Sequence, residues 1–308
     1  MSPIRLALVG LGKIARDQHL PAIAATEGIE LVAVASRNAT LDGVAHFATL
    51  ADLLASGEAI DAVALCTPPQ GRHELAALAL KAGKHVLLEK PPGATVSELG
   101  PLIAAAQATG RTLFATWHSR FAPAVEPARA FLAARDIRSV AIEWKEDVRV
   151  WHPGQEWIWE PGGLGVFDPA INALSILTRI LPRPVFLTGA NLAFPTNRAA
   201  PVAAELDMAD TAGVPIRAEL DFLQTGPQTW DIRVETDAGD LTLSSGGAKL
   251  FHDGRPLIDE RDAEYAGIYR HFVELIAGGA SDVDVTPLAL VADAFLLGRR
   301  SIVAPFEY

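Results

Sequence analysis

The fold is decided close to the N-terminus, by the stretch IRLALVGLGKIA that spans residues 4–15. Its first six residues, all apolar except one, predict a buried strand, and the GxGxxA pattern that follows predicts a tight turn into a helix. Gly10 permits the turn, Gly12 lets the backbone approach a pyrophosphate, and Ala15 is small enough for the helix to pack on a sheet. The helix N-terminus would add N–H donors for the anion. This favours dinucleotide binding over the alternative, a purely structural glycine turn.

The alternation of strand and helix signals continues to about residue 121. Further strands are predicted over residues 30–35, 44–47, 62–66, 85–89 and 112–116, and helices over residues 14–25, 49–56, 72–82 and 95–109. Near-continuous apolar strands separated by helices of about three turns are typical of a parallel sheet that is covered on both faces. The sequence therefore predicts an α/β protein in which residues 1–121 form a doubly wound, NAD(P)-binding Rossmann domain.

The pattern changes in residues 122–308, which are predicted to form a substrate-binding domain. Helices are predicted over residues 123–134, 168–180, 264–277 and 287–301, and strands over 139–146 and, in alternation with turns, between 185 and 250. Clustered strands with segregated helices predict an α+β domain with an open, mainly antiparallel sheet. A large bare sheet face tends to be covered, which favours a homodimer through this sheet.

Charge and cysteine content limit the possible partners. The chain has 26 Lys and Arg residues against 37 Asp and Glu, a net charge of −11, and such a surface repels phosphate backbones and anionic lipid. The single cysteine, Cys66, excludes an intrachain disulfide and fits a reducing compartment. No apolar run approaches the roughly 20 residues of a membrane span. We therefore expect a cytoplasmic protein that binds a small molecule, neither nucleic acid nor membrane.

The residues after the second strand bear on the choice of cofactor. An acidic residue there would bind the ribose 2′-hydroxyl of NAD, but the sequence has Ser36, Arg37 and Asn38. A guanidinium and a hydroxyl suit a 2′-phosphate, so NADP is predicted, with NAD also accepted. The alternative is that Arg37 is solvated and that NAD is used through Ser36 and Asn38.

Lys90 follows the predicted strand over residues 85–89, at the edge of the sheet where ligands bind. The next residue, Pro91, biases Lys90 toward an extended conformation. A lysine at this place can donate to a substrate hydroxyl and help to move its proton. Spacing alone leaves a surface salt bridge open as the alternative.

Three motifs resemble the glucose–fructose oxidoreductase / inositol dehydrogenase (Gfo/Idh/MocA) family: GxGxxA at residues 10–15, Thr67-Pro68, and AGKHVLLEKP at residues 82–91. The resemblance covers essentially the whole chain, and residues 117–129 and 144–175 are similar to its bacterial L-arabinose/D-galactose 1-dehydrogenase branch. It implies a functional Lys90, with a cis peptide before Pro91. It also implies NAD(P)-dependent oxidation of C1 of a pyranose, L-arabinose or D-galactose or both, to the aldonolactone. A dehydrogenase of another sugar or polyol, such as D-xylose or inositol, and a non-catalytic NADP-binding sensor remain alternatives.

The stretch GGLGVFDPAIN at residues 162–172 places Asp168 and Asn172 four positions apart, on one helix face. From the residues alone, Asp168 could simply cap the helix and Asn172 could be a surface residue. The resemblance implies instead that this helix lies against the nicotinamide. The family pattern has an Asp followed four residues later by a His, and here Asn172 replaces that His. Because Asn cannot act as a general base near neutral pH, proton transfer falls to Asp168 or Lys90, with Asn172 orienting O1.

Four of the six tryptophans, at positions 144, 151, 157 and 159, lie close together beside Glu146 and His152. Tryptophan faces and charged groups complement the C–H faces and hydroxyls of a sugar, although core packing remains the alternative for at least two of them. We expect the sugar to bind between the two domains. The predicted catalytic residues are Lys90, Asp168 and Asn172. The predicted substrate contacts are His118, Glu146, Trp151, His152, Asp168, Asn172 and Trp230. The predicted cofactor contacts are Gly10, Gly12, Lys13, Ile14, Ser36, Arg37, Asn38, Cys66, Thr67, Pro68, His73, Glu89 and Lys90. No metal site is predicted, and the histidines at 19, 46, 252 and 271 are expected to be structural or solvated.

Overall fold

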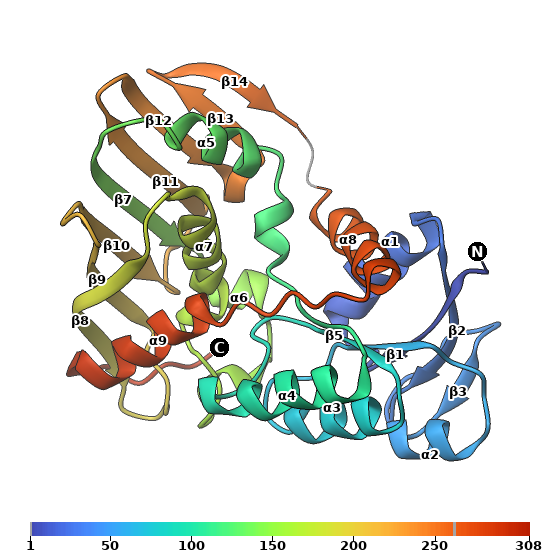
Figure 1. Cartoon of the computed structure of the whole chain (residues 1–308). Helices are drawn as coiled ribbons and strands as arrows, with labels where there is room; N and C mark the ends of the chain where they lie inside the picture. Colours follow the sequence, from blue (N-terminus) through green and yellow to red (C-terminus); the bar gives the residue numbers. More distant parts are fainter. Residues whose placement is uncertain (1, 261–262) are drawn as a thin grey trace. The chain divides into compact units, whose positions relative to one another are not determined.

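The computed structural model describes residues 2–260 and 263–308, which form two compact units (Figure 1). Unit 1 comprises residues 2–118 and 265–285, and unit 2 comprises residues 119–260, 263–264 and 286–308. The predicted division after residue 121 gave the whole C-terminal part to the second domain. The segment Tyr265–Val285 packs with unit 1 instead, because Phe272 stacks on Phe114 and the backbone of Asp282 pairs with Phe114 at the end of the sheet.

Unit 1 is built on a six-stranded sheet in the order β3-β2-β1-β4-β5-β6. The strands are β1 (Ile4–Val9), β2 (Ile29–Ala35), β3 (Ala45–Phe47), β4 (Ala62–Leu65), β5 (His85–Leu88) and β6 (Leu113–Ala115). All neighbouring strands run parallel, and the order is that of the doubly wound Rossmann fold. The predicted architecture of this part is thus confirmed. Its strands end at one common edge, where the loops after β1, β2, β4, β5 and β6 lie.

Helices cover both faces of this sheet (Figure 1). One face carries α2 (Leu50–Ala55), α3 (Arg72–Lys81) and α4 (Leu99–Thr109), and the other carries α1 (Leu20–Ala25) and α8 (Glu264–Gly278). The first helix was predicted as one continuous element, but a π-helical segment, η1 (Ala15–His19), precedes α1. Because helices cover both faces, β4, β5 and β6 are buried along nearly their whole length, whereas the edge strand β3 is partly exposed.

Unit 2 is built on a nine-stranded sheet in the order β14-β13-β12-β11-β7-β10-β9-β8-β15. The strands are β7 (Ile137–Lys145), β8 (Val185–Pro195), β9 (Ala203–Asp210), β10 (Pro215–Asp221), β11 (Thr229–Thr236), β12 (Gly239–Ser244), β13 (Lys249–His252), β14 (Arg255–Asp259) and β15 (Arg299–Val303). Among the strands that the structure describes in this sheet, β7 with β10 and β8 with β15 pair in parallel and the other neighbours pair antiparallel, which confirms the mainly antiparallel sheet. The prediction missed β14 and β15. The last helix was predicted to reach residue 301, but it ends at Leu297, and β15 then pairs with β8.

One face of this sheet is covered by α5 (Val125–Leu132), α7 (Phe167–Ile180) and α9 (Thr286–Leu297) (Figure 1). The other face is rich in charged side chains, because polar residues alternate with the buried ones along each strand. Ion pairs link neighbouring strands there, Lys145 to Glu219 at 2.7 Å and Arg217 to Asp207 at 3.2 Å. Within residues 2–260 and 263–308, none of the helices combines the length and the hydropathy that crossing a bilayer requires.

Candidate functional site

The GxGxxA stretch forms the turn between β1 and the first helix, at the carboxyl edge of the parallel sheet. Gly10 has a φ of +90°, and a Cβ there would lie 3.0 Å from Thr67 Cγ2 and 3.1 Å from the Thr67 nitrogen. A Cβ at Gly12 would meet no atom within 4 Å, so its backbone borders open space. Ala15 is completely buried. Gly10 therefore permits the turn and the close loop packing, whereas Gly12 leaves backbone that a pyrophosphate could approach.

The loop after β4 lies against this turn. Cys66 is buried, and Thr67 Oγ1 is a buried hydroxyl without a hydrogen-bond partner in the described chain. Such an orphaned atom at a nucleotide-binding edge fits a ligand donor or acceptor. Of the other predicted cofactor contacts, Pro68 and Ile14 are exposed, Lys13 is exposed and pairs with Asp17, and His73 donates from Nδ1 to Glu98 O at 3.0 Å.

The three residues after β2 remain accessible for a cofactor. Arg37 and Asn38 are exposed, Ser36 is half-buried, and none of them carries a carboxylate. A second guanidinium reaches the same loop, since Arg16 donates to Thr40 O at 3.3 Å. Arg16 was not predicted from the sequence, although its position one turn after Gly12 was an available signal. Two arginines near this loop suit an anionic group on the ribose.

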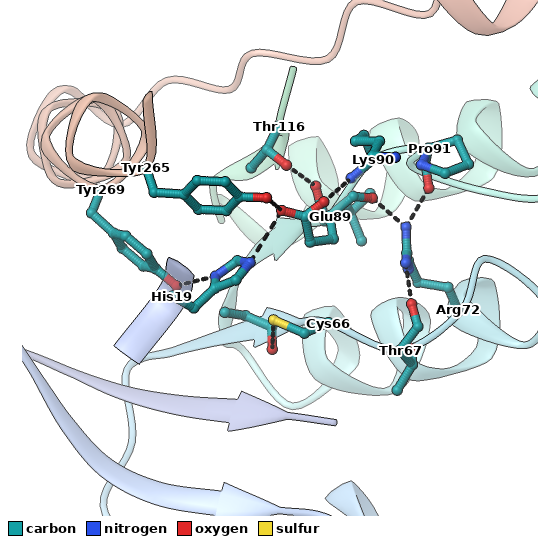
Figure 2. A network of polar contacts seen from close by, with 12 residues as sticks. His19, Cys66, Thr67, Arg72, Glu89, Lys90, Pro91, Thr116, Tyr265 and Tyr269 are labelled. Atoms are coloured by element: carbon teal, nitrogen blue, oxygen red, sulfur yellow. Dashed lines mark hydrogen bonds and ion pairs between the residues drawn. The ribbon is translucent and has the colours of Figure 1, made fainter. Parts of the chain in front are cut away.

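Lys90 follows β5, and the Lys90–Pro91 peptide bond is cis, as the resemblance implied. The preceding residue, Glu89, is only 3% exposed, and its carboxylate lies within a network of polar contacts (Figure 2). Its Oε1 accepts from Tyr265 Oη at 2.8 Å and from His19 Nε2 at 3.1 Å, and its Oε2 accepts from the Lys90 N–H at 2.7 Å. The Glu89 side chain, predicted to contact the cofactor, therefore makes its contacts inside the protein, with Lys90, with His19 of η1 and with Tyr265 of α8.

In this network, the opposite charges of Glu89 and His19 favour the ionised form of each group. Burial opposes ionisation of Glu89, but the hydrogen bond from His19 and the positive charges of His19, His118 and Lys90 lower its pKa from 4.5 to about 2. Burial would likewise lower the pKa of His19, but its interactions with Cys66, Tyr269 and Glu89 raise that pKa well above 6.5. The buried pair is therefore ionised near neutral pH.

His118, a predicted substrate contact, belongs to unit 1 and is half-buried. Its ring stacks on Tyr265, with ring centroids 5.3 Å apart and planes at 22°. Because Tyr265 donates to Glu89, His118 lies next to the network that holds Lys90. The structure thus groups His118 with Lys90, whereas the other predicted substrate contacts belong to unit 2.

In unit 2, three titratable side chains from three segments meet. Glu146 follows β7, His152 follows the short helix α6 (Val148–Trp151), and Asp168 is the second residue of α7. His152 Nε2 lies 3.3 Å from Glu146 Oε1, and its Nδ1 lies 3.7 Å from Asp168 Oδ2. Both carboxylates are 2% exposed. The structure therefore brings together three predicted substrate contacts and places His152 between two carboxylates.

The backbone before α7 explains the placement of Asp168. The N-cap of α7 is Val166, which makes no side-chain cap, so Asp168 does not cap the helix. Gly165 has a φ of +56°, and a Cβ there would lie 2.2 Å from Pro201 O, so only glycine permits this close approach. Asn172 lies one turn after Asp168, and its Oδ1 is buried without a hydrogen-bond partner among the described residues.

The tryptophans near this cluster have different roles. Trp144 and Trp230 are paired in register on β7 and β11 and stack with centroids 6.1 Å apart, and Trp151 packs on Trp230 at 4.9 Å. Trp230 also donates from Nε1 to Glu146 Oε2 at 2.9 Å, and Trp151 remains 40% exposed. Trp159 is fully buried core. The predicted contacts Trp151 and Trp230 therefore border the polar cluster. In the part of the chain that the structure describes, no group of three or more His, Cys, Asp or Glu side chains is arranged to hold a metal.

Comparisons with known proteins identify the family and support the fold. Residues 4–116 match the model of an oxidoreductase family with an NAD-binding Rossmann fold (Gfo/Idh/MocA). The chain is 50% identical over 306 residues to galactose 1-dehydrogenase of Pseudomonas fluorescens, covering 99% of each protein. It is 60% identical to D-galactose-1-dehydrogenase from Rhizobium etli, whose crystal structure aligns with a TM-score of 0.96 over 100% of this chain and 99% of that one. A 3-ketoreductase from Actinomadura kijaniata, solved with NADP and TDP-benzene, shares the fold with a TM-score of 0.83 at 20% identity, over 98% of this chain and 100% of that one.

Proposed function

Because the chain belongs to the Gfo/Idh/MocA family of oxidoreductases, we propose that it is an NAD(P)-dependent aldose 1-dehydrogenase that oxidises D-galactose, L-arabinose or both. The two galactose 1-dehydrogenases that are similar over their full length support the first sugar. L-Arabinose has the same ring stereochemistry as D-galactose at C2 to C4, so one pocket can accept both. The observation that carries the proposal is the buried cluster of Glu146, His152 and Asp168 beside the ring faces of Trp151 and Trp230.

Unpaired polar atoms favour a hydroxyl-rich ligand at this cluster. Among the described residues, Glu146 Oε1 and Asn172 Oδ1 are buried acceptors that receive no hydrogen bond, although Glu146 Oε1 lies 3.3 Å from His152 Nε2. A buried acceptor without a donor costs about 1–3 kcal/mol, so both atoms gain from a ligand that donates. Ring hydroxyls of a sugar donate, and its C–H face packs on an indole such as Trp151.

The reaction removes a hydride from C1 and a proton from O1 of the pyranose, and the product is the aldonolactone. The bound nicotinamide supplies the hydride acceptor. Asp168 as a carboxylate, or Lys90 as a neutral amine, accepts the proton from O1, and the amide of Asn172 orients that oxygen. Asn172 itself cannot accept the proton near neutral pH, which leaves the two ionisable groups for this task.

For the cofactor, we propose that NADP is bound and that NAD is also accepted. Arg37 and Arg16 supply guanidinium groups at the loop after β2, where Ser36 adds a hydroxyl. Replacing Arg37 by Asp puts a carboxylate where the 2′-phosphate would lie. The ratio of kcat/KM for NADP to that for NAD should fall in Arg37→Asp, whereas an unchanged ratio would contradict this assignment.

A sugar panel followed by the absorbance of the reduced cofactor, run with NAD and with NADP, tests the proposed function. D-Galactose and L-arabinose should give the highest kcat/KM. Preference for D-xylose or an inositol would instead indicate another member of the same reaction class. Tight NADP binding without oxidation of any sugar would indicate a sensor and contradict the proposal. The homodimer through the nine-stranded sheet stays a prediction, which light scattering of the purified protein would check.

A further inference from the structure

Arg72, the first residue of α3, was not singled out by the sequence, yet it is a buried cation beside Lys90. Its side chain is buried at 2% exposure. Its guanidinium donates to three backbone carbonyls, those of Thr67, Glu89 and Pro91 (Figure 2). Two of these carbonyls flank Lys90 in sequence, and the third belongs to the loop after the neighbouring strand β4. One side chain therefore ties together the loops that follow β4 and β5.

The backbone N–H of Lys90 is held by a second buried group, the carboxylate of Glu89. It donates to Glu89 Oε2 at 2.7 Å, and the other oxygen of that carboxylate is held by Tyr265 and His19. His19 is itself completely buried and contacts Tyr269 Oη through Nδ1 at 2.7 Å. Buried charged side chains thus hold three backbone groups around Lys90: the carbonyl of Glu89, the N–H of Lys90 and the carbonyl of Pro91.

We propose that Arg72 is a positioning residue for Lys90 and that the buried pair of Glu89 and His19 completes the same support. Because backbone direction sets the Cα–Cβ bond, fixing these three groups restricts where the Lys90 ammonium can lie. The link to Thr67 also fixes Lys90 relative to the loop that packs against Gly10. The inference rests on the proposed function in one respect, that Lys90 contacts the substrate hydroxyl.

The chemistry of the guanidinium separates this role from simple stabilisation. Its planar fork reaches three carbonyls at once, whereas a lysine ammonium keeps the charge but loses the fork. Buried charges are costly and are often replaceable by apolar side chains without loss of stability. Arg72 and the buried pair of Glu89 and His19 are therefore better explained by the orientation that they impose on Lys90 than by a gain in stability.

The test compares Arg72→Lys and Arg72→Ala with a matched control, Arg5→Lys. Arg5 belongs to the same unit and also donates to a backbone carbonyl, Ala59 O at 2.6 Å, but lies at the amino edge of the sheet. Because a misplacement of about 1 Å can cost about 10²-fold, Arg72→Lys should lower kcat about 10- to 100-fold. KM for the sugar and Kd for NADP should change less than about threefold, and Arg5→Lys should keep kcat. Methylguanidinium in the assay should restore part of the kcat of Arg72→Ala.

A second readout does not depend on turnover. The chain has six lysines, so reductive ¹³C-methylation gives few resonances, and Lys90→Arg identifies that of Lys90. Arg72→Lys should shift or broaden the Lys90 resonance and leave the other lysines unchanged. Tyr265→Phe, which removes only the donor to Glu89 and is a milder change, should do so to a smaller extent.

The two proposals fail in different ways. A folded Arg72→Lys with unchanged kcat and an unchanged Lys90 resonance would overturn the positioning role. The positioning role would also be overturned if Arg5→Lys lost as much kcat as Arg72→Lys and methylguanidinium did not restore the kcat of Arg72→Ala. If the wild-type protein oxidises no sugar of the panel, the proposed function fails, but the Lys90 resonance still decides whether Arg72 positions this lysine.

Discussion

The network around Glu89 in unit 1 and the cluster around His152 in unit 2 both join carboxylates to a histidine, but they differ in how completely their atoms are paired. Both oxygens of Glu89 accept hydrogen bonds, at 2.7 to 3.1 Å. His152 lies 3.3 Å from Glu146 Oε1 and 3.7 Å from Asp168 Oδ2, and within the described chain the contact to Glu146 Oε1 lacks the geometry of a hydrogen bond. A fully paired network fixes geometry, whereas an incompletely paired one gains from a ligand. The first therefore suits a support, and the second suits a binding site whose contacts shorten when substrate is present.

The largest expected effect comes from the groups proposed to move the proton. Lys90→Ala and Asp168→Ala should each lower kcat at least about 10²-fold, the scale of general acid–base catalysis. Steady-state kinetics with D-galactose measures this loss, and NADP affinity with circular dichroism checks that each variant is folded. Near-normal turnover in both variants would refute the assignment of these two residues.

The paired network should leave a signature in the pH dependence of stability. The pKa of Glu89 is lowered from 4.5 to about 2, so its contribution is full above pH 4.5 and is lost as pH falls toward 2. The pKa of His19 is raised, so its contribution is full below 6.5 and is lost as pH rises through the raised value. The free energy of unfolding of wild type minus that of Glu89→Gln should therefore be largest between about pH 4.5 and 6.5, on the order of 3 kcal/mol.

Urea unfolding of both proteins at several pH values measures this difference. Glu126→Gln is the matched control, because Glu126 also has a pKa lowered, against the effect of its burial, by hydrogen bonds from Arg129 and Arg179. That carboxylate is 48% exposed, and solvent screening should keep its contribution below about 1 kcal/mol. A difference for Glu89 that does not vary with pH would mean that the pair is not ionised in the folded protein.

Sequence predicted the fold where the signals are local, and missed contacts between distant residues. The GxGxxA turn and the alternation of strands and helices were sufficient for the six-stranded sheet, which the structure confirms. His19 meets Glu89 across 70 positions and Tyr269 across 250, distances at which spacing carries no information. Arg72 was missed because its partners are backbone carbonyls, which have no signature in a sequence.

In the candidate site, the residues were predicted from the sequence, but which of their atoms form hydrogen bonds was not. Glu146, His152 and Asp168 were predicted as substrate contacts, and the structure places both carboxylates within ion-pair distance of His152. Their residue types did not indicate which atoms would lack partners, because pairing depends on side-chain positions from three separate segments. The orphaned Oδ1 of Asn172 is visible only in three dimensions.

Because Asn172 Oδ1 receives no hydrogen bond among the described residues, replacing Asn172 should stabilise the ligand-free protein and weaken the binding of the sugar. In Asn172→Leu an apolar side chain replaces the unpaired acceptor, which should stabilise the ligand-free protein by about 1 kcal/mol and raise KM for the sugar. Asn197→Leu is the matched control, since Asn197 Nδ2 donates to Phe306 O at 3.0 Å and its Oδ1 accepts from the Phe306 N–H at 2.9 Å. Urea unfolding should show that this control is destabilised. If both variants lose stability equally, Asn172 is satisfied in solution and the contrast between the two networks weakens.

The smallest effect is expected on the outer face of the nine-stranded sheet, where charges are paired but solvated. Arg217 lies 3.2 Å from Asp207, and the two side chains are 80% and 58% exposed. Screening and side-chain entropy reduce such a pair to less than about 1 kcal/mol, so Arg217→Ala should change neither kcat nor the free energy of unfolding beyond that. Urea unfolding and kinetics at low and high salt measure this. A larger, salt-sensitive loss of stability that depends on protein concentration would mean that the face is covered by a second copy, so that its charges behave as buried ones.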